Sequence, residues 1–539
     1  MTETNHRKLL AGPYDLAVVG GGINGAGIAY DASRRGKSVV LLEKGDFAHG
    51  ASSQTSKMLH GGIRYLEQFH FGLVFEALRE RYRLLKLAPH LAKTHSFVIP
   101  VYEGTRRGPR MIRLGLFLYN VLALGRNVGH ARFLSREEVR SRVPELLDNG
   151  LVGGGLYYDV VMDDARLCLA NAIGVAELAT PPGRAAALNY ADVSEVRPGT
   201  PCTLRVTDRL NGAEHRIYAH QVVRALGPWT EPKHLVPSKG VHLVLPQFPM
   251  EEGLLLSHPK DGRVFFLVPW QHRTLIGTTE SLHNDSPDNL QVEPEEMRYL
   301  LDEVQRLFPN IKIGASDVLG TFAGVRPLAK SRSFFGRRRP GSVSRVHRIV
   351  KEENVLSVFG GKYTTYRAVA KQVVDTLFPG TRCSTHRIPI PGGEGGNWQS
   401  FADKYGPWSG NIEQAQVERL YSRYGTRALD ILKRWQVDSE LAQPITAGVS
   451  ETRAEVVYGI ESEFVAYPVD FLARRTTLRL QQDEWQSVYD AVESLIREHA
   501  PVVPAGLSAA RDRYFAARQW EEHLRAGETR GVDAPDMSR

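Results

Sequence analysis

Five residues in two distant parts of the chain could bind an anion and move a proton. His60, Arg64 and Tyr65 lie close together, whereas Arg326 and Lys362 lie far downstream. Guanidinium groups match phosphate or carboxylate in a bidentate geometry, and ammonium groups attract the same anions. A histidine with a pKa near neutrality can take the proton of an alcohol while hydride leaves the carbon. Together, these residue types indicate a site for an anionic alcohol, provided that the fold brings them together.

Simpler interpretations compete with this one. Taken alone, any of the arginines is more typical of a surface ion pair, and His60 of a hydrogen-bonded core residue. His242 could face the substrate from a sheet. Asp163 and Asp164 resemble paired catalytic carboxylates, but we interpret one of them as the cap of a following helix. The sequence shows neither the spacing of metal ligands nor a Ser-His-Asp arrangement.

Candidate catalytic residues need a cofactor, and the stretch from Tyr14 to Glu43 predicts one. An apolar strand, Tyr14–Val19, leads into Gly20, Gly22 and Gly25, which form the G-x-G-x-x-G pattern. Such glycines permit a tight turn, close approach of a pyrophosphate, and close packing of helix on strand. The helix N-terminus then favours the phosphates, and Glu43 ends the second strand where a ribose would bind. The stretch predicts binding of a dinucleotide.

A second glycine turn predicts which dinucleotide binds. The strand around Ser357 is followed by Gly360 and Gly361, and a helix begins near Tyr363. This helix N-terminus could stabilise negative charge on a reduced flavin. Nicotinamide domains do not need such a long-range return of the chain, whereas flavin folds often have one. We therefore predict FAD and consider a nicotinamide cofactor the weaker alternative.

The bulk properties predict a multidomain globular protein. With 539 residues the chain is too long for one core, and its three cysteines are few and widely spaced, as in a reducing compartment. Its net charge of +8 is compatible with nucleic acid, anionic lipid or an anionic substrate, or with solubility alone. Nucleic-acid motifs and stacking aromatics are not apparent, so we expect no nucleic-acid partner. Residues 1–10 are polar, without the features of a signal peptide, and no apolar run is long enough to span a bilayer.

The expected elements place a helical region after a mixed α/β region. Among the helices is one over Phe71–Leu87, with Glu80 on its outer face. Alternating strands between residues 240 and 279 suggest an antiparallel sheet. A Pro/Gly-rich linker near residues 389–396 precedes amphipathic helices at about 411–424, 428–435, 453–462 and 483–498. We predict domains over residues 12–385 and 386–526 and a disordered tail over 527–539.

The segment from Arg106 to Arg126 combines basic and apolar residues. Several arginines precede a run of leucine, phenylalanine and tyrosine that is too short to span a bilayer. Two interpretations stay open: a helix lying in a membrane interface, and a buried helix with basic flanks.

The chain resembles the FAD-dependent, respiratory glycerol-3-phosphate dehydrogenases. The resemblance extends over about residues 14 to 380 and rests on highly specific motifs. The region after residue 380 resembles the additional domain of that family more loosely. The matching segments are Val19–Gly27, Ser56–Leu66, Asp163–Leu167, Ile276–Glu280, Gly324–Leu328 and Phe359–Tyr366.

The resemblance implies a fold and an activity. The fold would be α/β: a glutathione-reductase-like FAD-binding domain interleaved with a substrate domain of mixed sheet, plus a helical C-terminal cap. The activity would be oxidation of sn-glycerol 3-phosphate at C2 to dihydroxyacetone phosphate, with electrons passing through FAD to quinone. It also implies monotopic attachment to the cytoplasmic face of the cell membrane. An oxygen-using oxidase of an amino acid or other hydroxy acid is the alternative, and a homodimer is left open.

Residue roles follow from the matched motifs. Catalysis would involve His60, Arg64, Arg326 and Lys362. The substrate would be bound by Arg64, Tyr65, Arg326, Lys362 and His242. The cofactor would be bound by Gly20, Gly22, Gly25, Glu43, Ser53, Ser56, Lys57, His60, Gly61, Gly62, Gly227, Gly360, Gly361 and Lys362.

The chain departs from the family pattern at three places. Leu226 stands where the family usually has a threonine before Gly-Pro-Trp, so one hydroxyl near the cofactor is missing. Val241 replaces a hydroxyl residue before His242, and Gln54 and Thr55 vary the serine loop. FAD binding is still expected, whereas the fine substrate preference is open.

Overall fold

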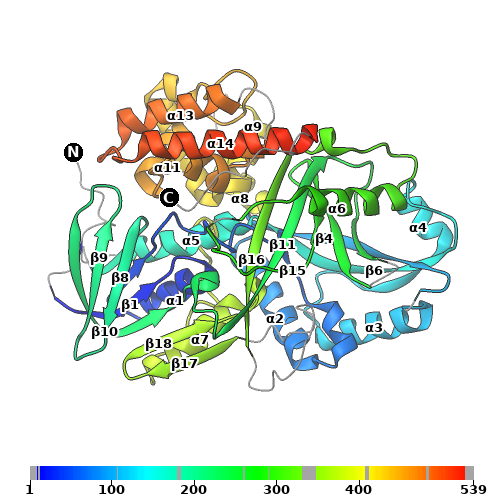
Figure 1. Ribbon diagram of the computed structural model, residues 1–539, viewed down its shortest axis with the longest axis horizontal. Helices are drawn as coiled ribbons and strands as arrows, with labels where there is room; N and C mark the ends of the chain where they lie inside the picture. Colours follow the sequence, from blue (N-terminus) through cyan, green and yellow to red (C-terminus); the bar gives the residue numbers. More distant parts are fainter. Residues whose placement is uncertain are drawn as a thin grey trace.

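A computed structural model shows two sheets that share the first two thirds of the chain and a group of helices that follows them (Figure 1). The residues described are 9, 12–105, 107–178, 184–258, 262–288, 290–330, 347–406, 412–480 and 485–527. The expected tail from residue 528 onward and Arg106 lie outside these residues.

The first sheet is the dinucleotide-binding layer. Its parallel centre runs β18 (Val355–Phe359), β10 (Glu214–Arg224), β1 (Tyr14–Val19), β2 (Val39–Leu42), β7 (Ala185–Leu188). Three more strands pair antiparallel at its margin, β17 (Arg348–Glu352), β8 (Ala191–Arg197) and β9 (Cys202–Asp208). β1 and β2 are nearly all apolar, as expected for strands covered on both faces.

Three helices cover one face of this sheet, α1 (Ile23–Arg34), α5 (Asp164–Glu177) and α7 (Tyr366–Leu377). α1 packs against both of the others, and Gly27 lets the Tyr366 ring approach it: a Cβ at Gly27 would lie 2.6 Å from that ring. Because α1 follows β1 directly in the chain, it begins at the carboxyl end of this central strand. Open α/β sheets bind ligands at this edge.

The second sheet is mixed, as the resemblance implied. Most of its strand pairs are antiparallel, and β12 with β4 is a parallel pair. Its order is β15 (Ser281–Leu282), β11 (Leu235–Pro246), β14 (Arg273–Gly277), β13 (Val264–Trp270), β12 (Gly253–Ser257), β4 (Ala92–Tyr102), β6 (Leu151–Met162), β3 (Met58–Leu59). In addition β16 (Gly320–Ala329) pairs with β11, and β5 (Arg132–Ser135) pairs with β6. Because its strands alternate along the chain with those of the first sheet, the two layers are interleaved.

Further helices flank the second sheet: α2 (Phe71–Leu87), α3 (Pro109–Leu122), α4 (Arg136–Arg142) and α6 (Pro294–Leu307). α2 begins and ends at the predicted residues, but the prediction that Glu80 faces outward is wrong. Glu80 is fully buried, and its carboxylate accepts hydrogen bonds from Arg367 of α7 at 2.6 and 2.8 Å. A basic partner from a distant helix makes burial of this carboxylate tolerable, and helical periodicity cannot reveal such a partner.

The C-terminal region is helical and lies on one side of the molecule, opposite α2 and α3 (Figure 1). It consists of α8 (Trp398–Tyr405), α9 (Gln414–Tyr424), α10 (Ala428–Val437), α11 (Arg453–Ser462), α12 (Pro468–Asp470), α13 (Trp485–His499) and α14 (Leu507–Ala526). The predicted helices near 428–435 and 453–462 are present, whereas α14 was not expected. The boundary between residues 385 and 386 stays a prediction. Among the described residues, no helix is both long and apolar enough to cross a membrane.

Candidate active site

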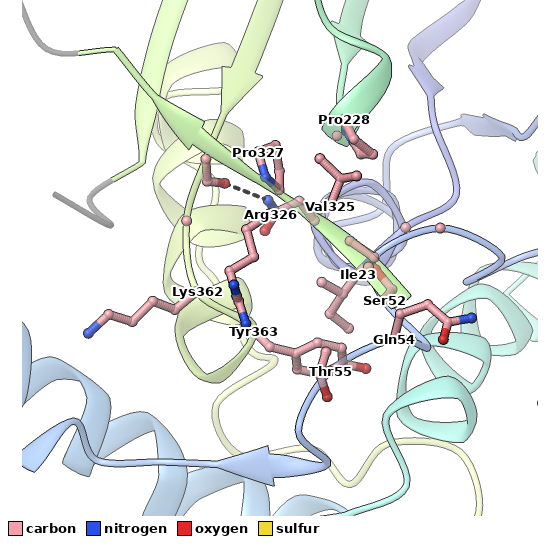
Figure 2. A pocket seen from close by; sticks show the side chains of 18 of the residues that line it. Ile23, Ser52, Gln54, Thr55, Pro228, Val325, Arg326, Pro327, Lys362 and Tyr363 are labelled. Carbon is pink, nitrogen blue, oxygen red and sulfur yellow. Dashed lines mark hydrogen bonds between the residues drawn. The ribbon is translucent and has the colours of Figure 1, made fainter. Parts of the chain in front are cut away.

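One cavity joins the two sheets and collects most of the predicted site residues. Its lining falls into two groups, which we call its two ends: Gly20, Gly22 and Glu43 from the first glycine turn and β2, and His60, His242 and the residues of β16 and of the turn after β18. Predicted residues that line it are Gly20, Gly22, Glu43, Ser56, His60, Gly227, His242, Arg326, Gly360, Gly361 and Lys362. Figure 2 shows Arg326, Lys362, Tyr363 and Thr55 around this space, together with Ile23 and Ser52.

The glycine turn after β1 fits a pyrophosphate. Gly20 has φ +108°, and a Cβ there would lie 2.4 Å from the carbonyl oxygen of Ala225. Gly25 is not a lining residue; a Cβ at Gly25 would lie 1.8 Å from the Gly20 oxygen. The third glycine of the motif therefore lets α1 pack against the turn, and the first lets the turn approach the backbone of Ala225 at the end of β10.

Glu43 is held rigidly at the end of β2. Its carboxylate accepts hydrogen bonds from the backbone N–H of Gly21 at 2.6 Å and of Gly45 at 2.9 Å. Carboxylate oxygens have further lone pairs, so Glu43 can still accept from a ribose hydroxyl. Its place on the cavity lining supports the predicted contact with the cofactor, which stays a prediction.

Two residues that the sequence analysis did not select complete this end. Ser52 accepts a hydrogen bond at 2.9 Å from the N–H of Ile23, in the first turn of α1. Asn24 donates to the Gly360 carbonyl at 3.2 Å and so ties the first glycine turn to the second. The only available signal for Asn24 was its place inside the glycine motif; the sequence gives none for Ser52, because only the fold brings its loop to α1.

Arg326 and Lys362 enter the cavity from different elements. The Arg326 guanidinium on β16 donates to the Thr278 hydroxyl at 2.8 Å, which sets its direction. The Lys362 ammonium lies 3.6 Å from the centre of the Tyr65 ring, at the turn after β18, and its side chain points away from Arg326 in Figure 2. Both residues line the cavity, and each cation has a neighbour that fixes its direction.

His242 is buried against the second sheet. Its ring stacks on Phe322 with centroids 4.8 Å apart, and its Nε2 forms a 2.9 Å hydrogen bond with Ser56. Nδ1 is buried without a hydrogen-bond partner among the described residues. Burial, reinforced by the charges of Arg326 and Lys57, holds the pKa of His242 well below its usual range. The imidazole is therefore neutral near pH 7 and has capacity for a ligand.

His60 follows β3 and lines the same cavity, and its backbone carbonyl accepts from the Thr364 hydroxyl at 3.3 Å. The His60 and Tyr65 rings lie 6.3 Å apart, centroid to centroid. Predicted residues that the structure places outside the lining are Gly25, Ser53, Lys57, Gly61, Gly62, Arg64 and Tyr65.

The Lys57 ammonium is bound by neighbouring protein groups. Its ammonium forms a 2.6 Å ion pair with Asp164 and donates to the Ser53 carbonyl at 2.7 Å. Asp163 accepts at 3.0 Å from the N–H of Arg166 and caps α5, as predicted. The acidic pair thus holds the loop and the helix rather than lining the cavity, and the predicted cofactor contact of Lys57 receives no support from its side chain.

The residues of the cavity fit an FAD. The lining combines a glycine turn, the helix N-terminus that follows it, and two residues, Asn24 and His242, that have a buried polar atom, Oδ1 and Nδ1 respectively, without a hydrogen-bond partner among the described residues. Among the described residues, no group of three or more His, Cys, Asp or Glu could hold a metal ion. Fold and site are those of a flavin-dependent oxidoreductase.

Comparison with known proteins supports this class and narrows it. Residues 15–375 match the FAD dependent oxidoreductase family, and residues 383–502 match the C-terminal domain of alpha-glycerophosphate oxidase. A Synechocystis protein named glycerol-3-phosphate dehydrogenase is 33% identical over 88% of this chain and 90% of its own length. An aerobic glycerol-3-phosphate dehydrogenase of Bacillus subtilis is 32% identical over 90% of this chain and 91% of its own.

Comparison with solved structures gives the same family and fold. The glycerol-3-phosphate dehydrogenase of Bacillus halodurans, complexed with FAD, aligns over 98% of this chain and 97% of its own with a TM-score of 0.75 and 27% identity. Glycine oxidase of Geobacillus kaustophilus, at 20% identity and a TM-score of 0.51 over 68% of this chain and 94% of its own, shares the fold alone. The chain belongs to the family of FAD-dependent glycerol-3-phosphate dehydrogenases, and FAD is its cofactor.

Proposed function

We propose that this protein oxidises sn-glycerol 3-phosphate at C2 to dihydroxyacetone phosphate and passes the electrons to a membrane quinone. The observation that carries the proposal is that two cations, Arg326 and Lys362, and two histidines, His60 and His242, line the same cavity as the glycine cradle. A phosphorylated alcohol needs cations for its phosphate and a proton acceptor for its hydroxyl, and these residues offer both. The names of the relatives support the same substrate.

Arg326 and Lys362 hold the phosphate in this proposal. The bond to Thr278 sets the direction of the guanidinium before substrate arrives, and the Tyr65 ring does the same for the ammonium. Binding the phosphate at fixed points orients C2 toward the cofactor, so much of the rate comes from positioning. Arg64 lies just outside the lining, in the 3-10 turn Ile63–Gln68, and contributes positive potential to the same end.

A histidine takes the hydroxyl proton. His60 is the proposed base, because it lines the cavity and its backbone is hydrogen-bonded to Thr364 in the turn after β18. His242 is the second candidate, because its imidazole is neutral and Nδ1 has no described hydrogen-bond partner. The bound flavin supplies the hydride acceptor at N5. The protein residues orient the substrate, hold its charge and remove its proton.

Anaerobic bleaching tests the substrate. Purified yellow protein should lose the visible absorbance of its oxidised flavin when sn-glycerol 3-phosphate is added without oxygen. The mirror-image isomer, glycerol 1-phosphate, is the matched control and should bleach the flavin far more slowly. A spectrum that does not change with the sn-3 isomer refutes the proposal.

Reoxidation of the bleached protein then tests the acceptor. A soluble quinone should restore the yellow colour faster than air does. Oxygen is the specific alternative, since residues 383–502 match a domain named for an oxidase. Stoichiometric peroxide from glycerol 3-phosphate, with slow quinone reduction, would make the protein an oxidase; peroxide from amino acids instead would change the substrate as well.

We further propose that the outward face of α3 contacts an anionic membrane on the cytoplasmic side. Leu114, Phe117 and Val121 are 49 to 62% exposed and recur at helical spacing, while Leu116 and Tyr119 of the same helix are buried; Leu124, just after the helix, is 64% exposed. Exposed Arg110 and Arg113 flank this stripe. An apolar stripe bordered by cations is suited to a headgroup interface.

Flotation with vesicles tests this membrane contact. Holoenzyme should float with phosphatidylglycerol vesicles, and Phe117→Asp should reduce the bound fraction strongly. Val437→Asp is the matched control, since Val437 is an 89% exposed apolar residue on the C-terminal helix α10. If Val437→Asp releases the protein and Phe117→Asp does not, the membrane contact belongs to the C-terminal helices.

A further inference from the structure

A buried polar network lies directly behind the His60–Gly62 segment and has no part in the scheme above. Its centre is Asp159 on β6, 1% exposed. One oxygen, Oδ1, accepts three hydrogen bonds: from the Gly61 N–H at 2.8 Å, the Arg81 guanidinium at 2.5 Å and the Tyr119 hydroxyl at 2.9 Å. Arg81 and Tyr119 are also buried, at 1% and 2% exposure.

The members of this network also form hydrogen bonds with one another and with the backbone. Arg81 donates additionally to the Tyr119 hydroxyl at 3.0 Å and to the Tyr158 carbonyl at 2.7 Å. Burial raises the pKa of Tyr119 well above its usual value, so the phenol remains a donor to the carboxylate. Because a buried charge needs its partners, the position of Asp159 relative to α2 and α3 is strongly determined.

The network acts on the backbone of the site. β3 pairs with β6 in the register Leu59 to Val160, which brings the next residues of the β3 strand beside Asp159. Tyr119 closes the space around Gly61, since a Cβ there would lie 2.1 Å from its hydroxyl. Only a glycine fits, and its N–H is captured by the carboxylate. The position of Gly61 is therefore fixed, and with it those of its chain neighbours His60, which lines the cavity, and Gly62, whose φ is +81°.

The same segment also contacts the turn after β18. The His60 carbonyl accepts from Thr364, and a Cβ at Gly62 would lie 3.6 Å from the Lys362 ammonium. A small movement of Gly61 would therefore displace the His60 ring and the surroundings of Lys362 together. Misplacement of reacting groups by about 1 Å can cost on the order of 100-fold in rate.

We propose that Asp159 is a positioning residue for the oxidation, with Arg81 and Tyr119 holding its carboxylate against the Gly61 amide. The inference rests on the proposed function, since it assigns His60 and Lys362 to the reacting end of the cavity. Asp159 itself is buried behind the loop and acts through Gly61.

Tyr119→Phe tests the inference and leaves the buried charges of Asp159 and Arg81 paired with each other. The ring and its packing stay, and one donor to Asp159 is lost. Flavin reduction at saturating glycerol 3-phosphate should slow by about 10-fold, the effect of one hydrogen bond on a positioned loop. The visible flavin spectrum should also shift, because His60, the residue before Gly61, lines the cofactor cavity. Flavin content should stay at the wild-type value.

Tyr489→Phe is the matched control. Tyr489 is fully buried in the C-terminal helices, and its hydroxyl has no hydrogen-bond partner among the described residues. The Tyr489→Phe variant should keep the wild-type rate of flavin reduction and the wild-type flavin spectrum. A double variant, Asp159→Asn with Arg81→Met, removes both charges and should reproduce the slow reduction in a folded holoenzyme.

The outcomes separate the two proposals. If wild-type protein is not bleached, the substrate assignment fails, and the spectral comparison of Tyr119→Phe with Tyr489→Phe still decides the positioning role. If the wild type is bleached and Tyr119→Phe matches it in both reduction rate and spectrum, the network is structural only and the inference is overturned. A fall in thermal stability without either change has the same meaning.

Discussion

The two ends of the cavity are built in different ways. The cradle for the dinucleotide comes from one strand–turn–helix unit, with Gly20, Gly22 and Gly25 inside a stretch of six residues and Glu43 at the end of the next strand. The other end is assembled from β3, β11, β16 and the turn after β18. The first end is a local backbone geometry, whereas the second depends on how two sheets are placed against each other.

This difference teaches where a substitution should act. A change in the cradle should remove the cofactor and with it all activity. A change at the substrate end should leave the cofactor bound and alter rate or affinity. The cradle is not wholly local, however: the loop after Glu43 carries Asp46, which is fully buried and paired with Arg474 and Arg475 of the C-terminal region.

Gly25→Ala should have the largest effect, which is purification without flavin. The new Cβ would lie 1.8 Å from the Gly20 oxygen, so the turn and α1 must separate. Visible absorbance per protein measures the loss. Gly115→Ala on α3, where a Cβ would meet nothing within 4 Å, should stay yellow. A yellow Gly25→Ala protein would break the distinction between the two ends.

Replacing the histidine that accepts the proton should have the second-largest effect on flavin reduction. His60→Gln and His242→Gln are compared by the rate of flavin reduction across pH, with flavin content as the control. The variant that lacks the base should be slower by about 100-fold or more, and the other by much less. Equal, small effects would show that neither imidazole takes the proton.

Arg326→Ala should lower kcat/KM for glycerol 3-phosphate by about 10- to 100-fold, the worth of a charge-assisted hydrogen bond. Flavin content should not change, because the Arg326 guanidinium donates to Thr278 and does not contact the glycine turn after β1. Steady-state kinetics measure the effect, and Arg348→Ala, at an exposed arginine of β17, is the control. Loss of flavin in Arg326→Ala would show that the two ends are not separate.

Asp46→Asn should have the smallest effect, mainly on stability. Burial alone would raise the pKa of Asp46, but Arg475 and Arg474 outweigh it and lower the pKa to about 2. Because this folded-state pKa lies below the ordinary one, the stabilisation is present above about pH 4 and is lost as pH falls toward 2. Near pH 7 it amounts to about 2 kcal/mol.

Chemical denaturation of wild type and Asp46→Asn at pH 7 and pH 3 measures this contribution. The difference between the two proteins should shrink at the lower pH. A difference that is the same at both values would mean that the carboxylate charge does not hold the C-terminal region to the cradle loop. Weaker FAD binding by Asp46→Asn would show that this long-range contact supports the cradle.

Much of the fold was predictable from local patterns. The strand Tyr14–Val19 and the helix Phe71–Leu87 begin and end where apolar periodicity placed them. Helix α14 was not predicted because two of its six buried side chains, Arg518 and Glu521, are charged and interrupt the apolar pattern. Their burial depends on mutual pairing and on Arg479, which no apolar pattern records.

The candidate site divides in the same way. The sequence alone determined the glycine cradle with Glu43 and a family resemblance that singled out His60, Arg326 and Lys362, because residue spacing dictates a strand–turn–helix directly. Only the tertiary structure decided that Thr278 directs Arg326, that His242 is buried and neutral, and that Asp159 holds Gly61. These contacts arise between strands that are neighbours in space and distant in sequence, where register and burial, rather than spacing along the chain, determine what each side chain can reach.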